Sequence, residues 1–359
     1  MKDARMSWRA IFSIISTIAG IYIGFLTQKP VSSLCDPTEC PYCYGDDLCG
    51  DVEENKINLR YGSFSDAFNN LFGVKNVYFA DYGGVKVVLK KLGHRSELAR
   101  MTKKASEVKI FEQLNSAGGA LKACDPETSE LLVEKSRRSF GLEQLWSVLQ
   151  INSEPLILRI FERQDDWPVP ELYGACGLLI VEEHCGQPLN NFRTSDWHDR
   201  AFLALQLVEA AVNFTRKHAD FRMYLTDISP DNIAVDDDFN LCFIDLENVI
   251  LKQKLADEDS VHYSEHFDED DFVYDEGAVC QSSMSDHNVY AVCRLLLSRR
   301  APWPMMRNGL LHSAPPNVVV RYDELFALIE ECVDSDEKLS RFYIAEELIR
   351  LLKEATESH

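Results

Sequence analysis

Basic residues are scarce in this sequence relative to acidic ones. Lys and Arg total 37 against 58 Asp and Glu, which gives a formal net charge of −21. A field of that sign repels nucleic acid and anionic lipid, so both are set aside as partners of the folded part. The chain also lacks internal repeats and low-complexity segments. With 46 % hydrophobic and 26 % charged residues, it has the composition of a globular protein and not of a disordered one.

Long apolar runs are rare as well, and the run "AIFSIISTIAGIYIGFL" at residues 10–26 stands out because it carries no charge. About twenty apolar residues span a bilayer, whereas signal-peptide cores are usually shorter, roughly 7–15 residues, and no A-x-A cleavage site follows this run. We therefore expect an uncleaved signal anchor at 10–28, with residues 1–9 in the cytosol and the rest in the lumen, because basic residues precede the run. The alternative is a buried core helix. The basic residues are Lys2, Arg5 and Arg9.

Eleven cysteines support a luminal location. Four of them fall in "CDPTECPYCYGDDLC", within a segment (29–58) that we interpret as a Cys-rich luminal stalk. In a cytosolic protein the C-x2-C pair would indicate zinc, but beyond a luminal anchor disulfides are favoured. The odd total leaves at least one thiol free or bonded to another chain. The sequon at Asn213–Thr215 predicts N-glycosylation, although it falls inside a predicted helix.

Secondary-structure patterns divide the rest of the chain into a strand-rich half and a helical half. Strands are expected in a hairpin at 76–91 and in a second pair at 155–161 and 176–184, with helical patterning at 95–115 and 126–151. After residue 190, helices are expected at 201–214, 286–298, 322–333 and 341–355, with Phe202, Leu205, Val208 and Val212 on one face of the first. This order predicts an α+β, two-lobed fold with an N-lobe at 59–183 and a C-lobe at 184–359.

The segment "LTDISPDN" (225–232), followed by "IDLEN" (244–248), carries the residues that suggest chemistry. Phosphoryl transfer needs a carboxylate that orients the attacking hydroxyl, oxygen ligands for Mg²⁺ and a lysine that fixes the nucleotide. Kinases place an Asp and an Asn in H-R-D-x-x-x-x-N and a second Asp in D-F-G, after a short hairpin. We therefore interpret Asp227 as the catalytic residue, and we interpret Asn232 and Asp245 as metal ligands. The alternative is an Asp-rich turn beside an acidic hairpin.

Segments elsewhere favour the kinase interpretation by their order. "VVLK" ends a strand with Lys90, the candidate contact for the α- and β-phosphates. We expect Glu107 to pair with Lys90, while Glu97 and Glu112 remain open. Backbone groups of Glu183–Cys185 would meet an adenine. The remaining two features are Asp286, expected to brace the catalytic loop, and the closing segment "SRFYIAEELIRLL".

The motifs "CPYCYGDDLC", "GVKNVYFADYG", "LYGACG", "YLTDISPDNIAV" and "SDHNVYAVC" together resemble the divergent protein kinase domain 2 family, related to the FAM-type luminal kinases. The resemblance runs from about residue 40 to the C-terminus. It implies a kinase-like fold in the Golgi or outside the cell, with secreted members. Together with the anchor, we expect a protein of the Golgi or ER lumen, either a single-pass type II membrane protein or secreted. The set of Lys90, Asp227, Asn232 and Asp245 leads us to expect ATP with Mg²⁺ or Mn²⁺ as cofactor and a luminal or extracellular protein or glycan as substrate.

Departures from the kinase pattern keep other functions open. Leu225 and Thr226 replace the His and Arg of the catalytic loop, and Glu247 replaces the D-F-G glycine. No G-x-G-x-x-G loop precedes the hairpin, where only Gly62 and Gly73 occur, and no A-P-E follows. A pseudokinase that acts as a secreted signal or scaffold is the alternative, and transfer of AMP is a third. The acidic stretch 265–276 could select basic substrates, or it could be a solvated loop.

Overall fold

The computed structural model describes residues 30–61, 70, 76–101, 103–116, 121–255, 260–265, 274–301, 306–334 and 340–357. The predicted anchor at 10–28, Gly62 and Gly73 lie outside these ranges. Among the helices that the structure describes, none is both long and apolar enough to cross a bilayer. The chain divides into two compact units. The first comprises Met1–Ala105, Phe140–Pro155 and Glu171–His184, and the second comprises Ser106–Ser139, Leu156–Pro170 and Cys185–His359.

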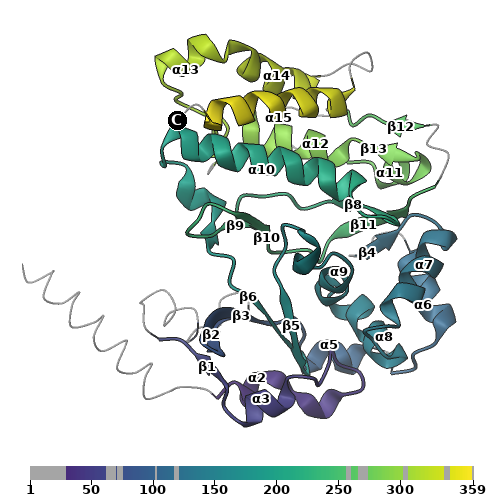
Figure 1. Cartoon of the computed structure of the whole chain (residues 1–359). Helices are drawn as coiled ribbons and strands as arrows, with labels where there is room; N and C mark the ends of the chain where they lie inside the picture. The colour runs from purple at the N-terminus through teal and green to yellow at the C-terminus, as the bar shows by residue number, and fades with distance from the viewer. Residues whose placement is uncertain are drawn as a thin grey trace, which may run out of the picture. The chain divides into compact units, whose positions relative to one another are not determined.

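The first unit is built on a five-stranded antiparallel sheet in the order β1-β2-β3-β6-β5 (Figure 1). The predicted hairpin forms β2 and β3, and its two-residue turn is Gly83-Gly84, both with positive φ, a conformation that glycine adopts without steric cost. The strands are β1 (Ile57–Leu59), β2 (Val77–Tyr82), β3 (Val85–Lys91), β5 (Leu172–Cys176) and β6 (Leu179–Glu183).

The Cys-rich segment differs from the loop-like stalk that we expected. It forms α2 (Ser32–Cys35), the 3-10 turn η1 (Pro37–Glu39) and α3 (Cys49–Glu53). Apolar side chains of this segment are buried against one face of the sheet, and a disulfide joins Cys49 to Cys176 on β5. The segment is therefore part of the hydrophobic core of the first unit, because apolar residues between its cysteines gain stability by covering a sheet face.

The first half departs from the expected elements in three places. The pattern at 95–115 is interrupted, giving α5 (Arg95–Arg100) and α6 (Glu107–Leu114), and the next stretch gives α7 (Pro126–Ser136) and α8 (Leu142–Ile151). The expected strand at 155–161 is wrong: these residues lie in α9 (Glu154–Ile160), which is followed by a 3-10 turn, η3 (Arg163–Asp165). A short apolar run does not by itself distinguish a buried strand from a buried helix.

The core of the second unit is a group of helices in which α10 packs along α15 and α12 (Figure 1). The predicted helix at 201–214 is the central part of α10, but Phe202 is partly exposed, whereas Leu205 and Val208 are buried. The helices are η4 (Leu189–Phe192), α10 (Trp197–Arg216), α11 (Glu276–Gln281), α12 (His287–Val292), η5 (Cys293–Leu297), α13 (Pro316–Arg321), α14 (Asp323–Asp334) and α15 (Arg341–Glu357). η5 is a π-helical continuation of α12.

Short sheets of the second unit carry the loops of interest. One has the order β4-β11-β8, another β10-β9-β7, and a third pairs β12 with β13. Gly186 has φ +108, and a Cβ atom there would meet the carbonyl of Val235, so the close approach of β7 to β9 requires glycine. The strands are β4 (Leu121–Ala123), β7 (Gln187–Pro188), β8 (Phe221–Leu225), β9 (Ile233–Val235), β10 (Leu241–Phe243), β11 (Val249–Gln253), β12 (Val261–His262) and β13 (Met284–Ser285).

Ten of the eleven cysteines form disulfides, as the luminal reading predicts and the zinc alternative does not. The eleventh, Cys35, is a buried free thiol. The pairs are Cys40–Cys43, Cys49–Cys176, Cys124–Cys280, Cys185–Cys242 and Cys293–Cys332.

Candidate active-site residues

Lys90 lies near the end of β3, on the sheet face opposite to the one that the Cys-rich segment covers. Side chains alternate along a strand, and cross-strand partners share a face. The pairings Val88 with Glu182 and Lys90 with Ile180 therefore place Glu182 on the same face as Lys90, one step along the neighbouring strand. The Lys90 ammonium lies 2.9 Å from a carboxylate oxygen of Glu182 and 2.9 Å from one of Glu154 at the start of α9.

This trio is almost completely removed from solvent. Lys90 is 9 % exposed, and Glu154 and Glu182 are each 1 % exposed. Burial opposes the charged form of Lys90, but the two carboxylates outweigh it and hold the pKa of the ammonium above its usual range. Lys90 is therefore a permanent cation held between two anions, and a change to any one of the three leaves buried charge uncompensated.

The expected pairing of Lys90 with Glu107 is wrong. Glu107 begins α6 in the second unit and forms an exposed ion pair with Arg137. The open alternative Glu97 instead accepts a hydrogen bond from the backbone N–H of His94 at the start of α5. The helix that follows β3 directly in the chain therefore does not supply the partner of Lys90.

Glu154 was missed because its segment was read as a strand. The signal that could have located it is "NSEP": an Asn two residues before the Glu and a Pro directly after it are typical of a helix start. In the structure Asn152 stabilises the start of this helix, because the N–H of Glu154 donates to its side-chain oxygen at 2.9 Å. Glu182 was missed because its neighbour Glu183 was assigned to an adenine contact.

The loop that carries Asp227 leaves the second unit's strand β8, and two side chains of α12 hold the end of that strand. The N–H of Leu225 donates to the side-chain oxygen of Asn288 at 2.9 Å, and the carbonyl of Leu225 accepts from His287 Nε2 at 2.8 Å. Asn288 also donates to the carbonyl of Met223 at 2.7 Å. Both polar groups of the last β8 residue are thus satisfied by neutral side chains, which fixes where the loop begins.

Asp286 does not brace this loop in the way that we expected. Its carboxylate forms a fully buried ion pair with Arg341 at 2.7 Å and accepts from the N–H of Ser264 at 2.8 Å. The bracing role belongs to the two residues that follow it. Burial lowers the pKa of His287 to about 4, against a smaller opposing effect of its hydrogen bond to Leu225, so the imidazole that holds the loop is neutral.

Asn232 and Asp245 leave the same end of the β9–β10 hairpin. Ile233 pairs with Phe243 in the antiparallel register, and the N–H of Ile244 donates to the carbonyl of Asn232 at 3.0 Å. The amide of Asn232 in turn donates to the backbone carbonyl of Asp227 at 3.3 Å. Asp227 and Asp245 are both exposed, so their carboxylates are open to a ligand.

The residues assigned to an adenine contact have partners within their own units. The N–H of Glu183 donates to the carbonyl of Glu171 at 2.9 Å, and the Glu183 carboxylate accepts from the N–H of Glu171 at 3.2 Å. Cys185 is the first residue of the last stretch of the second unit, and it forms a disulfide with Cys242 on β10. The adenine contact itself stays a prediction.

Comparisons with known sequences identify relatives of this chain. A sequence model described as "Protein-kinase domain of FAM69" matches residues 145–335. "Divergent protein kinase domain 2A" of Xenopus tropicalis is 32 % identical, over 90 % of this chain and 87 % of the relative. The Homo sapiens protein of the same name is 31 % identical over 86 % and 85 %, and "Divergent protein kinase domain 2B" of Homo sapiens is 24 % identical over 54 % and 42 %.

The chain belongs to the divergent protein kinase domain 2 family.

For a divergent kinase domain, the donor set in the second unit fits a nucleotide-bound Mg²⁺ or Mn²⁺. Such ions bind through one or two carboxylate or amide oxygens and complete their coordination with phosphates and water. Asn232 and Asp245 supply that number of oxygens from one hairpin end. Among the residues that the structure describes, no group of three or more His, Cys, Asp and Glu could hold a metal by itself.

Proposed function

We propose that this member of the divergent protein kinase domain 2 family acts in the secretory pathway. In this proposal it uses ATP with Mg²⁺ or Mn²⁺ to transfer phosphate to a luminal or extracellular protein or glycan. The observation that carries the proposal is the geometry of the second unit. The carboxylate of Asp245 and the amide of Asn232 leave one hairpin end, and Asn232 contacts the backbone of Asp227. Helix α12 also fixes the end of β8, from which the Asp227 loop leaves, through Leu225.

Each residue has a separate task in this proposal. Bound metal neutralises charge on the phosphates, and Asn232 and Asp245 would hold it. Asp227 orients the attacking hydroxyl of the acceptor and accepts its proton. Lys90 is held as a cation at a defined place on the sheet face, where it would contact the phosphates.

The disulfides support the secretory part of the proposal. Five disulfides are typical of an oxidising compartment, since cytosolic thiols are kept reduced. Four of them join residues at least 39 positions apart in the sequence, so they belong to the folding of both units and not to a local redox motif. The apolar run at 10–26 would deliver the chain to that compartment.

Nucleotide binding is tested by the melting temperature of the purified chain, with and without ATP, in Mg²⁺, Mn²⁺ or EDTA. We expect ATP to raise the melting temperature only in the presence of metal, because a ligand stabilises the state that binds it. Asp245→Ala should abolish the increase. Asp238→Ala, which removes the same charge from an exposed turn of the same hairpin, should keep it. No increase in the wild-type chain under either metal would refute the proposal.

Transfer is tested by incubating the chain with γ-labelled ATP and secreted proteins, and by measuring the mass of any adduct. Asp227→Asn should keep the thermal shift and lower the transfer rate by about 10²- to 10⁴-fold, the usual contribution of a positioned proton acceptor. An adduct with the mass of AMP would replace phosphate by AMP as the transferred group.

A pseudokinase without catalysis is the second candidate, and the trio at Lys90 favours it. A kinase lysine with one carboxylate partner has charge left for phosphates, whereas the Lys90 ammonium is already within 2.9 Å of two carboxylates. Under this alternative the wild-type chain and Asp227→Asn have equal activity as secreted signals, measured on responding cells.

A further inference from the structure

A cavity of about 380 Å³ lies in the second unit, between the β12 segment, α11 and the start of α12. Neither Asp227 nor Asp245 lines it. His287, which does line it, also donates to the carbonyl of Leu225 at the start of the Asp227 loop. Its volume is within the range of sites that enclose a small ligand or a side chain. The lining residues are Val261, His262, Tyr263, Ser264, Glu265, Tyr274, Asp275, Ala278, Ser282, His287 and Tyr290.

The described residues of the lining carry charge of one sign. Glu265 and Asp275 are both exposed carboxylates of the cavity wall, and no Lys or Arg is among the described residues that line it. Cations nearby have partners of their own. Lys122 pairs with Glu276, Lys252 donates to the carbonyl of Cys280, and Arg341, beside the Tyr290 ring, pairs with Asp286. The two carboxylates of the wall therefore favour a cationic ligand.

Three tyrosines make up much of the remaining wall: Tyr263, Tyr274 and Tyr290. The ring of Tyr274 packs edge-on against His287, with centroids 5.3 Å apart. The Arg341 guanidinium lies 4.7 Å from the centroid of the Tyr290 ring, so one tyrosine of this wall already binds a guanidinium from the protein side. Aromatic rings combined with carboxylates favour organic cations, and planar guanidinium groups in particular.

A buried residue fixes one side of the wall. Ser264 is 8 % exposed, and its backbone N–H donates to Asp286, which fixes its position. Its Oγ has no hydrogen-bond partner among the described residues, but this atom is itself covered by protein, so it is not counted as a contact for a ligand.

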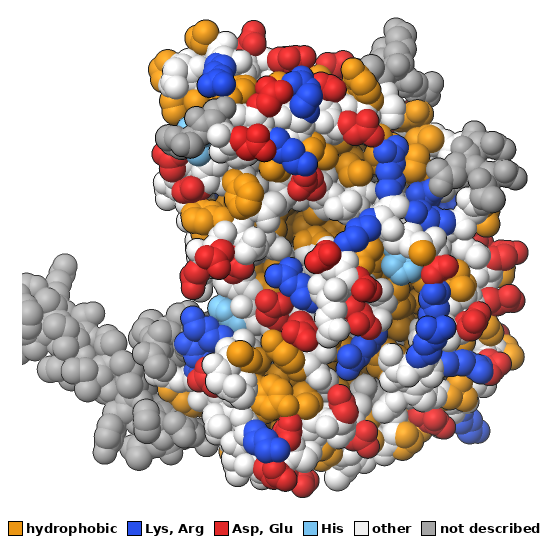
Figure 2. All heavy atoms as spheres, in the orientation of Figure 1, with side chains coloured by type: hydrophobic (Ala, Val, Ile, Leu, Met, Phe, Trp, Pro, Cys, Tyr) orange, Lys and Arg blue, Asp and Glu red, His pale blue; other side chains and the backbone are white. Residues whose placement is uncertain are grey.

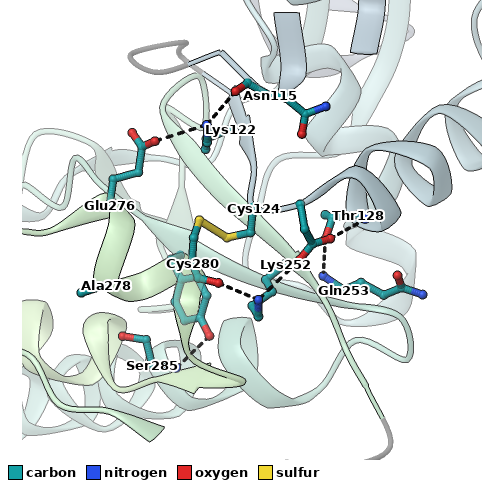
Figure 3. The surroundings of a disulfide bond; sticks show 12 residues. Asn115, Lys122, Cys124, Thr128, Lys252, Gln253, Glu276, Ala278, Cys280 and Ser285 are labelled. Atoms are coloured by element: carbon teal, nitrogen blue, oxygen red, sulfur yellow. Dashed lines mark hydrogen bonds and ion pairs between the residues drawn. A yellow bond between two sulfur atoms is a disulfide. The ribbon is translucent and has the colours of Figure 1, made fainter. Parts of the chain in front are cut away.

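The frame of the cavity is rigid where Figure 3 shows it. A disulfide between Cys124 and Cys280 ties α11 to the end of β4, and the ion pair between Lys122 and Glu276 joins the same two elements. Lys252 on β11 donates to the carbonyl of Cys280 beside the disulfide. The β12 segment pairs with β13. These links hold α11 and β12 in place before a ligand binds, which lowers the entropic cost of binding.

We propose that this cavity binds an arginine side chain of the polypeptide acceptor, with Glu265 and Asp275 as its counter-charges and the tyrosines as its walls. The role of the cavity as a pocket for the acceptor rests on the proposed kinase function, whereas the binding of an arginine side chain in it does not. The substrate class that follows is a basic secreted protein. Figure 2 shows Lys and Arg interspersed with Asp and Glu on the face in view, so overall charge alone does not provide such selection there.

The test uses fluorescence polarisation of two labelled heptapeptides of glycine and serine, one with a central arginine and one with citrulline, its neutral isostere. The purified full chain is titrated at low and at physiological ionic strength. We expect the arginine peptide to bind more tightly than the citrulline peptide at both. Glu265→Gln with Asp275→Asn should weaken the arginine peptide by about three- to tenfold, in line with partly exposed charge pairs. Asn is itself a good N-cap, so Asp275→Asn preserves the start of α11.

The matched control is Glu130→Gln with Glu134→Gln, which removes the same charge from exposed positions of α7. It should bind the arginine peptide as the wild-type chain does. Equal binding of arginine and citrulline peptides, or equal weakening in the two double variants, would overturn the proposal, provided that both fold with the wild-type melting temperature. Peptide binding without a nucleotide thermal shift refutes the kinase function and leaves the site standing. A nucleotide shift without peptide discrimination refutes the site alone.

Discussion

The two units hold their chemical groups in opposite ways. In the first, Lys90 is buried between Glu154 and Glu182 and belongs to the structural core. In the second, Asp227 and Asp245 are exposed on loops, and the buried contacts that support them are neutral. The comparison teaches that a lysine substitution probes stability and function together, whereas a substitution of either aspartate probes function alone.

The largest effect is expected from Lys90→Met. It leaves two buried carboxylates without their cation, so we expect a loss of about 3–5 kcal/mol in the free energy of unfolding. Denaturant unfolding measures it. The triple variant Lys90→Met, Glu154→Gln, Glu182→Gln removes the stranded charges and should recover most of the loss. A Lys90→Met variant as stable as the wild-type chain would show that the trio is not buried as described.

A smaller effect, dependent on pH, is expected from His287. Its pKa is about 4 in the folded chain, against an ordinary value of about 6.5. Between these two pH values the unfolded state therefore binds one proton more than the folded state. Stability therefore falls on acidification from pH 6.5 to 4, by about 3 kcal/mol from this residue. His287→Gln should remove that part of the pH dependence, measured by unfolding at several pH values. An unchanged slope would mean that the neutral imidazole does not anchor the β8 strand.

The smallest effect is expected from Asp227→Asn and Asp245→Asn. Exposed side chains away from buried networks usually change the free energy of unfolding by less than about 0.5 kcal/mol. Asp286→Asn is the informative control in the same unit, because its carboxylate is buried and paired with Arg341, and its loss should cost about 3–5 kcal/mol. Comparable destabilisation by Asp227→Asn would remove the distinction between the two units.

Local patterns were enough to predict the hairpin at 76–91, the central part of helix α10 and the short hairpin between Asn232 and Asp245. Each depends on neighbouring residues: turn chemistry, helical periodicity or a short strand run. The partner of Lys90 could not be predicted in that way. Glu154 is 64 residues away in the sequence, and Glu182 reaches Lys90 only through the β3–β6 register.

The structure of the Cys-rich segment could not be predicted for the same reason. Its cysteines were recognised, but the connection of Cys49 to Cys176 across 127 residues is a property of the sheet that the segment covers. Asp286 was assigned to the catalytic loop from its position before α12, whereas its buried partner is Arg341 on α15. A charged residue takes the partner that removes it from water at least cost, and position in the sequence does not identify that partner.

The sequence by itself determined the family, the order of the functional segments and the residue types that phosphoryl transfer needs, because these are properties of short stretches read in order. Tertiary structure alone decided which carboxylates surround Lys90, which side chains hold Leu225, and that Glu265, Asp275 and Ser264 line one cavity. Those outcomes depend on burial and on contacts between distant segments, and electrostatic interactions become strong only where folding has excluded water.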